Sequence, residues 1–436
     1  MPTTDTRSLA PDATSSADLE AVGLEYTPVS ADDAAFEPFL RAVSRGFLGE
    51  EPSADEVESA RRALTSRRLT GVFDRAGVDP ASPVATVDSW PTELTVSPGR
   101  TIPLWSISAV TVAPTHRRRG IARAMLTGEL RTAAAAGFPL AGLTVTEATI
   151  YGRWGFSPAA WASDVAVDTR RARWTGPVAP GRLDFVSPES LPERLARVHE
   201  RIRVERPGAV PGWEGRWRGV AGLTPDAKDA KKVRAVSYRD TAGEERGVLV
   251  YTLESGPDGD FSPYVLTVRA LFADGDEATA ALWRFAIEHD LVGEVKASLQ
   301  PIAPPVQWMI ADRRAVTVTP TDHHWLRVLD VPAALSARRY AAALDVVLRV
   351  EDPLGFADGA WSVRIDADGS AVVGRAAQDR ATDLELTVGA LGSLLLGGVR
   401  VRDLAAAGLV RGPREHQAAL DAAFTPEVTP LLDIWY

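Results

Sequence analysis

Apolar and polar residues follow regular patterns along the first 170 positions, and these patterns predict an α+β unit. Segments 36–49 and 53–68 carry apolar residues at helical spacing, and Ser53 followed by Glu56 is typical of a capping box at a helix start. A further helix is predicted over 120–137. Runs bounded by Gly or Pro predict strands at 70–74, 82–90, 92–96, 104–112 and 140–146, followed by a short turn or helix at 149–156.

The remaining pattern indicates more than one domain. A joint with Pro and Gly lies at 169–181, and residues 182–315 then repeat the alternation of helices and strands in a similar order. This similarity indicates a divergent duplication. From Thr317 the pattern changes, with a hairpin expected around Asp368–Gly369. We expect four segments: a disordered tail at 1–21 and domains at 22–175, 176–316 and 317–436.

Composition narrows the function classes. The chain has 436 residues, is 45% hydrophobic and 24% charged, and carries a net charge of −10. It has no cysteine, which excludes disulfides, thiolate catalysis and cysteine-based zinc sites and fits a cytoplasmic location. The polar N-terminus is unlike a signal peptide, and no apolar run approaches the ~18 residues of a membrane span. The acidic balance argues against general affinity for nucleic acid and is compatible with a cationic substrate.

One basic loop stands out in this acidic chain. The sequence VAPTHRRRGIARAML (112–126) joins a predicted strand to a predicted helix, and 117–122 fits the pattern Arg/Gln-x-x-Gly-x-Gly/Ala. Backbone N–H groups at a helix start are unpaired and lie at the positive end of the helix dipole. With small residues at Gly120 and Ala122, the loop predicts a phosphate cradle; a solvated basic helix cap is the alternative.

A second copy of the same pattern occurs at 216–221. No predicted strand precedes it, and the sequence GLTP follows at once, so we expect no helix to open there. Context therefore assigns the phosphate site to the first copy alone.

Two motifs together carry a family resemblance. The stretch AVTVAPTHRRRGIARAML (109–126) resembles the acetyl-CoA loop of GNAT acetyltransferases, and TEATIYGRWGF (146–156) follows it. With LGSLLLGGVR (391–400) and the chain end, they make the sequence similar to the Eis (enhanced intracellular survival) family of actinobacterial acetyltransferases over nearly its whole length. The resemblance implies an α+β fold: two tandem GNAT-like mixed-sheet domains, the second lacking a working cofactor loop, then a sterol-carrier-protein-like α/β domain.

The same resemblance implies the site residues. Tyr151 matches the general acid, and the terminal carboxylate of Tyr436 matches the proposed base. Residues matched to acetyl-CoA binding are Val110, Thr111 and Val112 for the pantetheine arm, Arg117, Arg118, Arg119, Gly120, Ile121, Ala122 and Arg123 around the pyrophosphate, and Thr146 and Glu147 further along the cofactor.

Acyl transfer to an amine raises two proton problems. The leaving thiolate has a pKa of about 8.5 and tyrosine one of about 10, so Tyr151 is a fitting acid at a cost of ~2 kcal/mol; a buried aromatic cluster with Trp154 and Phe156 is the alternative. An α-carboxyl near 3.5 lies about seven units below an alkylammonium. Three roles for the Tyr436 carboxylate therefore remain open: a base whose pKa is raised by burial, a base that acts through a water molecule, or a charge that attracts the ammonium. The apolar ending LLDIWY predicts a docked chain end.

Two other groups of residues are weaker candidates for a functional site. Asp322, His323 and His324 suggest a metal site only superficially, since adjacent strand residues point to opposite faces, and we expect no metal. Glu50, Glu51, Asp55 and Glu56 fall where substrate-facing helices lie in the family and attract a cation or form a solvated face.

We therefore predict a cytoplasmic, acetyl-CoA-dependent N-acetyltransferase acting on primary amines of polycationic substrates, of aminoglycoside or lysine and polyamine type, by direct attack on the thioester. The resemblance implies a homohexamer. Alternatives are a non-catalytic acyl-CoA or lipid binder, and a nucleic-acid contact at the arginine run, which the acidity disfavours.

Overall fold

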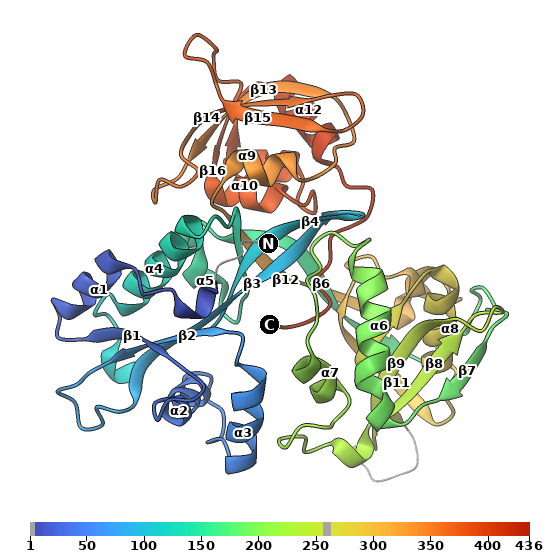
Figure 1. Ribbon diagram of the computed structural model, residues 1–436. Coiled ribbons are helices and arrows are strands. Elements are labelled where there is room, and N and C mark those ends of the chain that lie inside the picture. Colours follow the sequence, from blue (N-terminus) through green and yellow to red (C-terminus); the bar gives the residue numbers. More distant parts are fainter. Residues whose placement is uncertain (1–4, 256–262) are drawn as a thin grey trace. The chain divides into compact units, whose positions relative to one another are not determined.

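The computed structural model describes residues 5–255 and 263–436 (Figure 1). These residues form two compact units. The first holds the chain up to Ala160, His324–Pro430 and Tyr436, and the second holds Trp161–His323 and Leu431–Trp435. The chain leaves the first unit within strand β6 (Ser157–Asp168) and returns within β12 (Val316–Val328), so each unit combines segments that are distant in the sequence.

The first unit contains a mixed sheet with the strand order β1–β2–β3–β4–β5–β12. Neighbouring strands are antiparallel except β4 and β5, which are parallel and are joined by helix α4 (Ile121–Ala135). A helical crossover is the usual connection between parallel strands. Besides β12, the strands of this sheet are β1 (Glu25–Val29), β2 (Arg68–Phe73), β3 (Pro83–Ser97), β4 (Arg100–Val112) and β5 (Leu140–Thr144).

Helices cover both faces of this sheet because its strands are apolar on both sides. On one face α4 packs Ile121 and Met125 into a core together with α1 (Ala13–Glu20). On the other, Phe36 and Phe39 of α2 (Phe36–Gly46) form a separate core with α3 (Ala54–Ala63). The predicted capping box is confirmed: the Ser53 and Glu56 side chains each accept from the other residue's backbone N–H at the start of α3.

Two sequence expectations differ from the structure here. Residues 5–21 of the expected tail instead form a 3-10 turn and α1, because Asp12 caps the helix and Leu19 is buried in the core; residues 1–4 lie outside the described residues. The strands expected at 82–90 and 92–96 are one strand, β3. Pro91 does not interrupt β3, because β2 begins at Arg68 opposite Ser89 and no β2 residue pairs with β3 at Pro91.

The C-terminal part of the first unit forms a separate five-stranded sheet with its own helices. Its five strands have the order β15–β14–β13–β16–β17, with the expected hairpin at Gly369 between β14 and β15. The elements are α9 (Val331–Ser336), β13 (Leu344–Glu351), β14 (Gly359–Ile365), β15 (Ala371–Arg375), β16 (Leu384–Thr387), α10 (Val388–Leu394), α11 (Val401–Ala406), β17 (Val410–Arg411) and α12 (Arg414–Phe424).

The second unit repeats the topology of the first. Its strand order is β6–β11–β10–β9–β8–β7, and the parallel pair β10 and β11 is joined by a helix, α8, as β4 and β5 are joined by α4. Its elements are β7 (Arg182–Phe185), α6 (Leu191–Arg203), α7 (Glu214–Val220), β8 (Arg234–Arg239), β9 (Glu245–Glu254), β10 (Tyr264–Ala273), α8 (Asp276–Ile287) and β11 (Val292–Gln300).

The second copy of the arginine–glycine pattern (216–221) covers the end of this unit's helix α7, which stops at Val220, so no helix opens at this copy, as the sequence predicted. Arg216 is the third residue of the helix, so the pattern does not precede a helix start as the first copy does.

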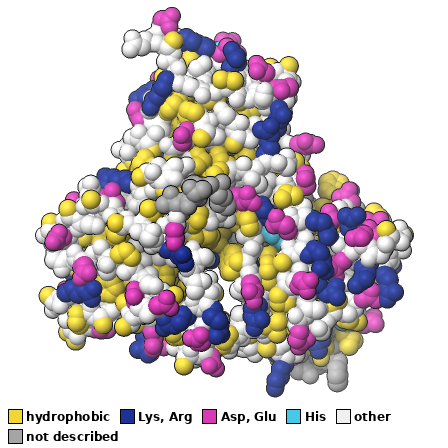
Figure 2. All heavy atoms as spheres, in the orientation of Figure 1, with side chains coloured by type: hydrophobic (Ala, Val, Ile, Leu, Met, Phe, Trp, Pro, Cys, Tyr) yellow, Lys and Arg dark blue, Asp and Glu magenta, His cyan; other side chains and the backbone are white. Residues whose placement is uncertain are grey.

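The surface carries charges of both signs. On the face shown in Figure 2, basic and acidic side chains are intermixed. Among the described residues no helix is both long enough and apolar enough to cross a membrane.

Candidate active site

The basic loop connects the end of β4 to the start of α4 through a sharp turn. The chain takes one 3-10 turn at Pro114–His116, and then Arg118 (φ 66°) and Gly120 (φ 79°) both adopt left-handed conformations. Gly120 is the N-cap of α4, and no side chain caps the helix. A Cβ added at Gly120 would meet open space, so the glycine serves the backbone conformation and leaves room for a ligand beside the first-turn amides.

A cavity of about 500 Å³ lies against this loop. The sequence-predicted residues that line it are Val112, Arg117, Arg118, Gly120, Ile121, Ala122 and Arg123, and the lining residues that were not predicted are His116, Thr127, Ile150, Arg153, Trp154 and Leu354. Arg119 is not among the lining residues; its guanidinium donates to the Val22 carbonyl at 3.0 Å. The structure thus brings together most of the predicted pyrophosphate loop around one cavity.

The charge of the cavity suits an anion. Within the described part of the chain, no carboxylate forms an ion pair with Arg117, Arg118, Arg123 or Arg153. His116 differs, since its Nε2 lies 3.1 Å from an Asp74 carboxylate oxygen. Four guanidinium groups without carboxylate partners, together with the amides at a helix start, form a strongly electropositive site.

Strands β4 and β5 diverge beside the loop. They pair only from Leu104 with Leu140 to Ser106 with Gly142, although β4 continues to Val112. The Ala113 amide donates to the Val84 carbonyl on β3 at 2.7 Å. Because N–H groups alternate in direction along a strand, the Val112 amide points away from β3, toward the opening between β4 and β5. We call this opening the β4–β5 fork.

The other predicted cofactor residues lie around the fork. Thr111 contributes to the β3–β4 ladder, and its hydroxyl lies 2.7 Å from that of Thr86. Val110 packs at the edge of the α4-side core. Thr146 and Glu147 are exposed in the turn that follows β5, where Glu147 accepts from the Thr149 hydroxyl at 2.6 Å.

Tyr151 ends the short helix α5 (Ala148–Tyr151), which follows β5. Its ring is buried and lies edge-on to Phe156, with ring centroids 6.3 Å apart. Burial, and secondarily the Glu147 carboxylate, raise the pKa of Tyr151 above its ordinary value of 10.0. The phenol therefore keeps its proton at neutral pH.

Tyr436 lies at the fork. The Thr144 hydroxyl at the end of β5 donates to its main-chain oxygen at 2.6 Å. Its phenol is 2.6 Å from His324 Nε2, and its ring meets Trp90 edge-on at 5.5 Å. Burial raises the pKa of this phenol well above its usual range. A Cβ added at Gly142 would come within 2.9 Å of the phenol oxygen, so the close approach depends on glycine.

The preceding residues dock within the second unit. Leu431, Leu432 and Ile434 are buried, as the apolar ending predicts, but Trp435 is 43% exposed and covers the His323 ring edge-on. Asp433 lies 3.2 Å from His199 and 2.8 Å from Arg206.

The two adjacent histidines have partners of other kinds than a metal. His323 Nε2 lies 2.9 Å from the Ile434 carbonyl, and His324 contacts the Tyr436 phenol. Across residues 5–255 and 263–436, no three His, Asp or Glu side chains are grouped as metal ligands.

Comparisons with known proteins agree with this geometry. Residues 28–159 and 208–328 each match models of an acetyltransferase (GNAT) domain, and 331–433 match a sterol carrier protein domain. N-acetyltransferase Eis of Mycobacterium tuberculosis is 32% identical over 369 residues, which are 82% of this chain and 87% of the relative. The chain belongs to the Eis family of N-acetyltransferases.

Two further relatives extend this likeness. An uncharacterised N-acetyltransferase of Streptomyces avermitilis is 33% identical over 91% of this chain and 94% of its own length. The crystal structure of Eis1 from Mycobacterium abscessus superimposes with a TM-score of 0.81 and 29% identity, covering 94% of this chain and all of that one. The expected α+β fold, with two GNAT domains and a sterol-carrier-like domain, is confirmed, and the protein is an acyltransferase that uses acetyl-CoA as co-substrate.

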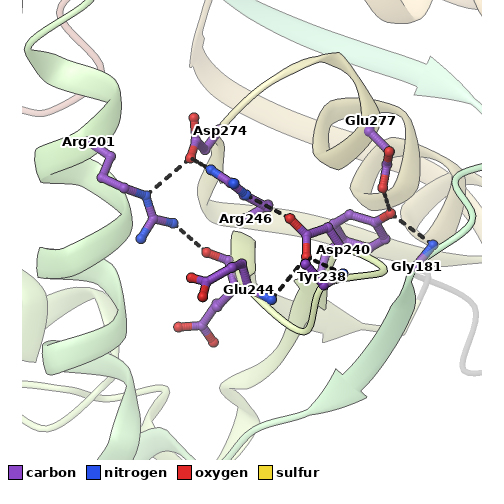
Figure 3. Close-up of polar contacts among 10 residues, drawn as sticks. Gly181, Arg201, Tyr238, Asp240, Glu244, Arg246, Asp274 and Glu277 are labelled. Atoms are coloured by element: carbon purple, nitrogen blue, oxygen red, sulfur yellow. Dashed lines mark hydrogen bonds and ion pairs between the residues drawn. The ribbon is translucent and has the colours of Figure 1, made fainter.

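The second GNAT domain carries acidic side chains at the start of α8, where the first domain carries basic ones at the start of α4. Only Asp274 and Gly275 separate β10 from α8, and Figure 3 shows Asp274 between Arg201 (3.1 Å) and Arg246 (2.9 Å). Asp276 and Glu277 occupy the first turn of α8, and Glu277 accepts from the Tyr238 hydroxyl. Carboxylates at a helix N-terminus satisfy the dipole from within the protein and repel a phosphate ligand.

Sequence reasoning missed Thr144, Trp90 and His324 as neighbours of Tyr436, and Leu354 and Arg153 as cavity residues. Thr144 and Trp90 lie in ordinary strand patterns, and Leu354 lies over 200 residues from the loop it faces. Arg153 alone had a usable signal, because it sits between Tyr151 and Trp154 in one of the two motifs that carry the family resemblance.

Proposed function

We propose that this Eis-family enzyme acetylates primary amines of polycationic substrates, of the aminoglycoside or lysine and polyamine type, by direct attack of the amine on the acetyl-CoA thioester. The observation that carries the proposal is the position of Tyr436, whose main-chain oxygen is held by Thr144 beside the β4–β5 fork. A carboxylate there would meet an incoming ammonium where the thioester is expected.

The coenzyme residues follow from the loop and the fork. In this proposal the Arg117–Arg123 loop holds the pyrophosphate, with Arg119 acting at its edge. Val110, Thr111 and Val112 line the pantetheine arm, with Thr146 and Glu147 further along. The Val112 amide, which points toward the fork, stabilises the negative charge that develops on the thioester oxygen.

Tyr151 is the proposed general acid. A thiolate of pKa about 8.5 accepts a proton from a phenol of pKa 10 or above at a cost of about 2 kcal/mol or more. The raised pKa of Tyr151 means that the proton is present at every pH at which the enzyme is expected to work. Tyr151→Phe should therefore lower kcat strongly and leave the affinity for acetyl-CoA unchanged.

For Tyr436 we favour attraction of the ammonium over direct proton abstraction. The donated hydrogen bond from Thr144 stabilises an ionised carboxylate, and an ordinary α-carboxyl is about seven pKa units too acidic to deprotonate an alkylammonium. The carboxylate would attract and orient the cation, and water would remove the proton.

Acidic residues in the loop after α2 support a cationic acceptor. The end of α2 lies against β4, since a Cβ on Gly46 would be 2.4 Å from the Thr111 side chain. The loop that leaves α2 at this point carries the exposed Glu50 and Glu51. Together with the net charge of −10, these carboxylates favour the approach of a polycation.

The test is a panel of amines with acetyl-CoA, followed by detection of free thiol. A triamine, an aminoglycoside and a lysine peptide should be acetylated at higher kcat/KM than a monoamine that carries no other charged group. Equal rates for all would refute the polycationic class. A chain extended beyond Tyr436 should lose activity toward the triamine, and a chain with the same extension at the N-terminus is the matched control.

Three further expectations stay proposals. We propose the domain boundaries 22–175, 176–316 and 317–436, a cytoplasmic location, and a homohexamer. Light scattering during size-exclusion chromatography measures the mass directly, and a monomer of 46.7 kDa would refute the hexamer.

A further inference from the structure

The sterol-carrier-like domain contributes a wall to the coenzyme cavity. Leu354, in the loop 352–358 between β13 and β14, lines the cavity together with Arg118, Thr127 and Trp154 of the GNAT domain. Leu354 is half-buried and packs, with Phe356, against the core beneath α4. We call residues 352–358 the wall loop.

A buried ion pair fixes the wall loop. Asp352 accepts hydrogen bonds from the amides of Leu354 (3.1 Å) and Ala357 (2.8 Å). Both of its carboxylate oxygens also accept from Arg327 of β12, at 2.6 and 2.8 Å. A fully buried pair with this many hydrogen bonds holds its neighbours rigidly.

The same guanidinium also holds the opposite part of the cavity. Arg327 Nε donates to the Trp154 carbonyl at 2.6 Å, and the Trp154 indole donates to the Thr127 hydroxyl at 3.3 Å. One arginine therefore connects Leu354 of the C-terminal domain with Trp154, and through it with α4, so that the two walls keep a set separation.

The cavity begins at Val112, at the edge of the fork, and runs from there along α4. Its lining extends from Ile121 to Thr127, about 9 Å along the helix axis, and includes no residue of β5. The pantetheine arm requires the fork, where Val112 presents its amide. The part of the cavity between α4 and the wall loop is thus left for the other arm of the coenzyme, which carries an adenine ring and a 3′-phosphate.

Arg153 is placed to meet that phosphate. It lies in the turn Gly152–Trp154, lines the cavity, is exposed, and forms no ion pair within the described residues. The arginines of the basic loop suffice for the two phosphates of the pyrophosphate, whereas Arg153 comes from a different element. An unpaired guanidinium suits a phosphate dianion.

We propose that the 3′-phosphoadenosine arm of coenzyme A binds between α4 and the wall loop, with Leu354 against the adenine and Arg153 paired with the 3′-phosphate. The C-terminal domain is then part of the coenzyme site. This inference rests on the proposed placement of the pyrophosphate at the Arg117–Arg123 loop.

Binding of coenzyme A and 3′-dephospho-coenzyme A, measured by calorimetry, tests the proposal without reference to activity. The intact protein should prefer coenzyme A by about tenfold or more, as a charge-assisted pair implies. Arg153→Gln should bind both compounds equally, at the affinity of the intact protein for the dephospho form. Arg402→Gln, which removes the same charge from an exposed surface site, should keep the preference. An unchanged preference in Arg153→Gln would overturn the inference.

A second variant tests the wall loop. Leu354→Ala should weaken 3′,5′-ADP, a probe of the adenosine arm, by about threefold to tenfold, as loss of buried apolar contact implies. Leu409→Ala, at an exposed leucine of the same domain, is the control and should bind 3′,5′-ADP normally. Normal binding by Leu354→Ala would refute the adenine contact. If the intact protein bound no coenzyme A at all, the proposed function itself would fail.

Discussion

Replacement of Thr144 by valine tests the proposed role of the chain end with little change of shape. Valine fills the same volume but cannot donate to the Tyr436 oxygen, which accepts from the threonine hydroxyl at 2.6 Å. A hydrogen bond to a charged group contributes about 1.5–3 kcal/mol. If that energy serves to hold the carboxylate where the ammonium binds, kcat/KM for a triamine should fall about 10- to 150-fold.

The assay is steady-state thiol release with the triamine varied at saturating acetyl-CoA. Thr144→Ser keeps the hydroxyl and should retain most of the activity. Coenzyme A affinity, measured by calorimetry, should be the same in both variants, because the Thr144 hydroxyl donates to Tyr436 and Thr144 is not among the residues proposed to hold the coenzyme. Equal kcat/KM for the Val and Ser variants, with both folded, would show that the hydrogen bond does not position a catalytic group.

Three other substitutions give separate tests. Gly142→Ala should displace the Tyr436 phenol, since the new methyl group would lie 2.9 Å from its oxygen, and lower kcat/KM while coenzyme A binding persists; unchanged kinetics would contradict this. Gly120→Ala should cost about 1–2 kcal/mol in unfolding free energy because φ is +79°, and a melting temperature equal to that of the intact protein would show that the loop relaxes freely. For Asp433, burial tends to raise the pKa, but the combined effect of His199 and Arg206 outweighs burial and the pKa falls from 3.8 to about 2, so the ionised carboxylate stabilises the fold above pH 4 and loses this effect as pH falls toward 2. Asp433→Asn should therefore lower the unfolding free energy by about 2 kcal/mol at pH 7 in urea titrations and by almost nothing near pH 2; a difference independent of pH would refute the ionic explanation.

Features that depend on nearby residues could be predicted from the amino-acid sequence. The capping box of Ser53 and Glu56 joins positions three apart, and α2, β4, α4 and β5 follow periodicities of a few residues. The turn at Gly120 belongs to the same class, because a left-handed residue before a helix has a local steric cause. The family motifs are equally local, which explains why the amino-acid sequence alone suffices to recognise the family.

The contacts between distant segments were decided by the tertiary structure. Whether 13–20 forms a tail or a helix depends on α4, where Gly128 leaves room for Ser15 to approach. The Thr144 hydroxyl meets an oxygen 292 positions away, and Leu354 faces a loop from another domain. No local pattern encodes such pairs, because each forms only after the whole core has packed. The sequence therefore determined the elements and the basic loop, and packing determined what surrounds them.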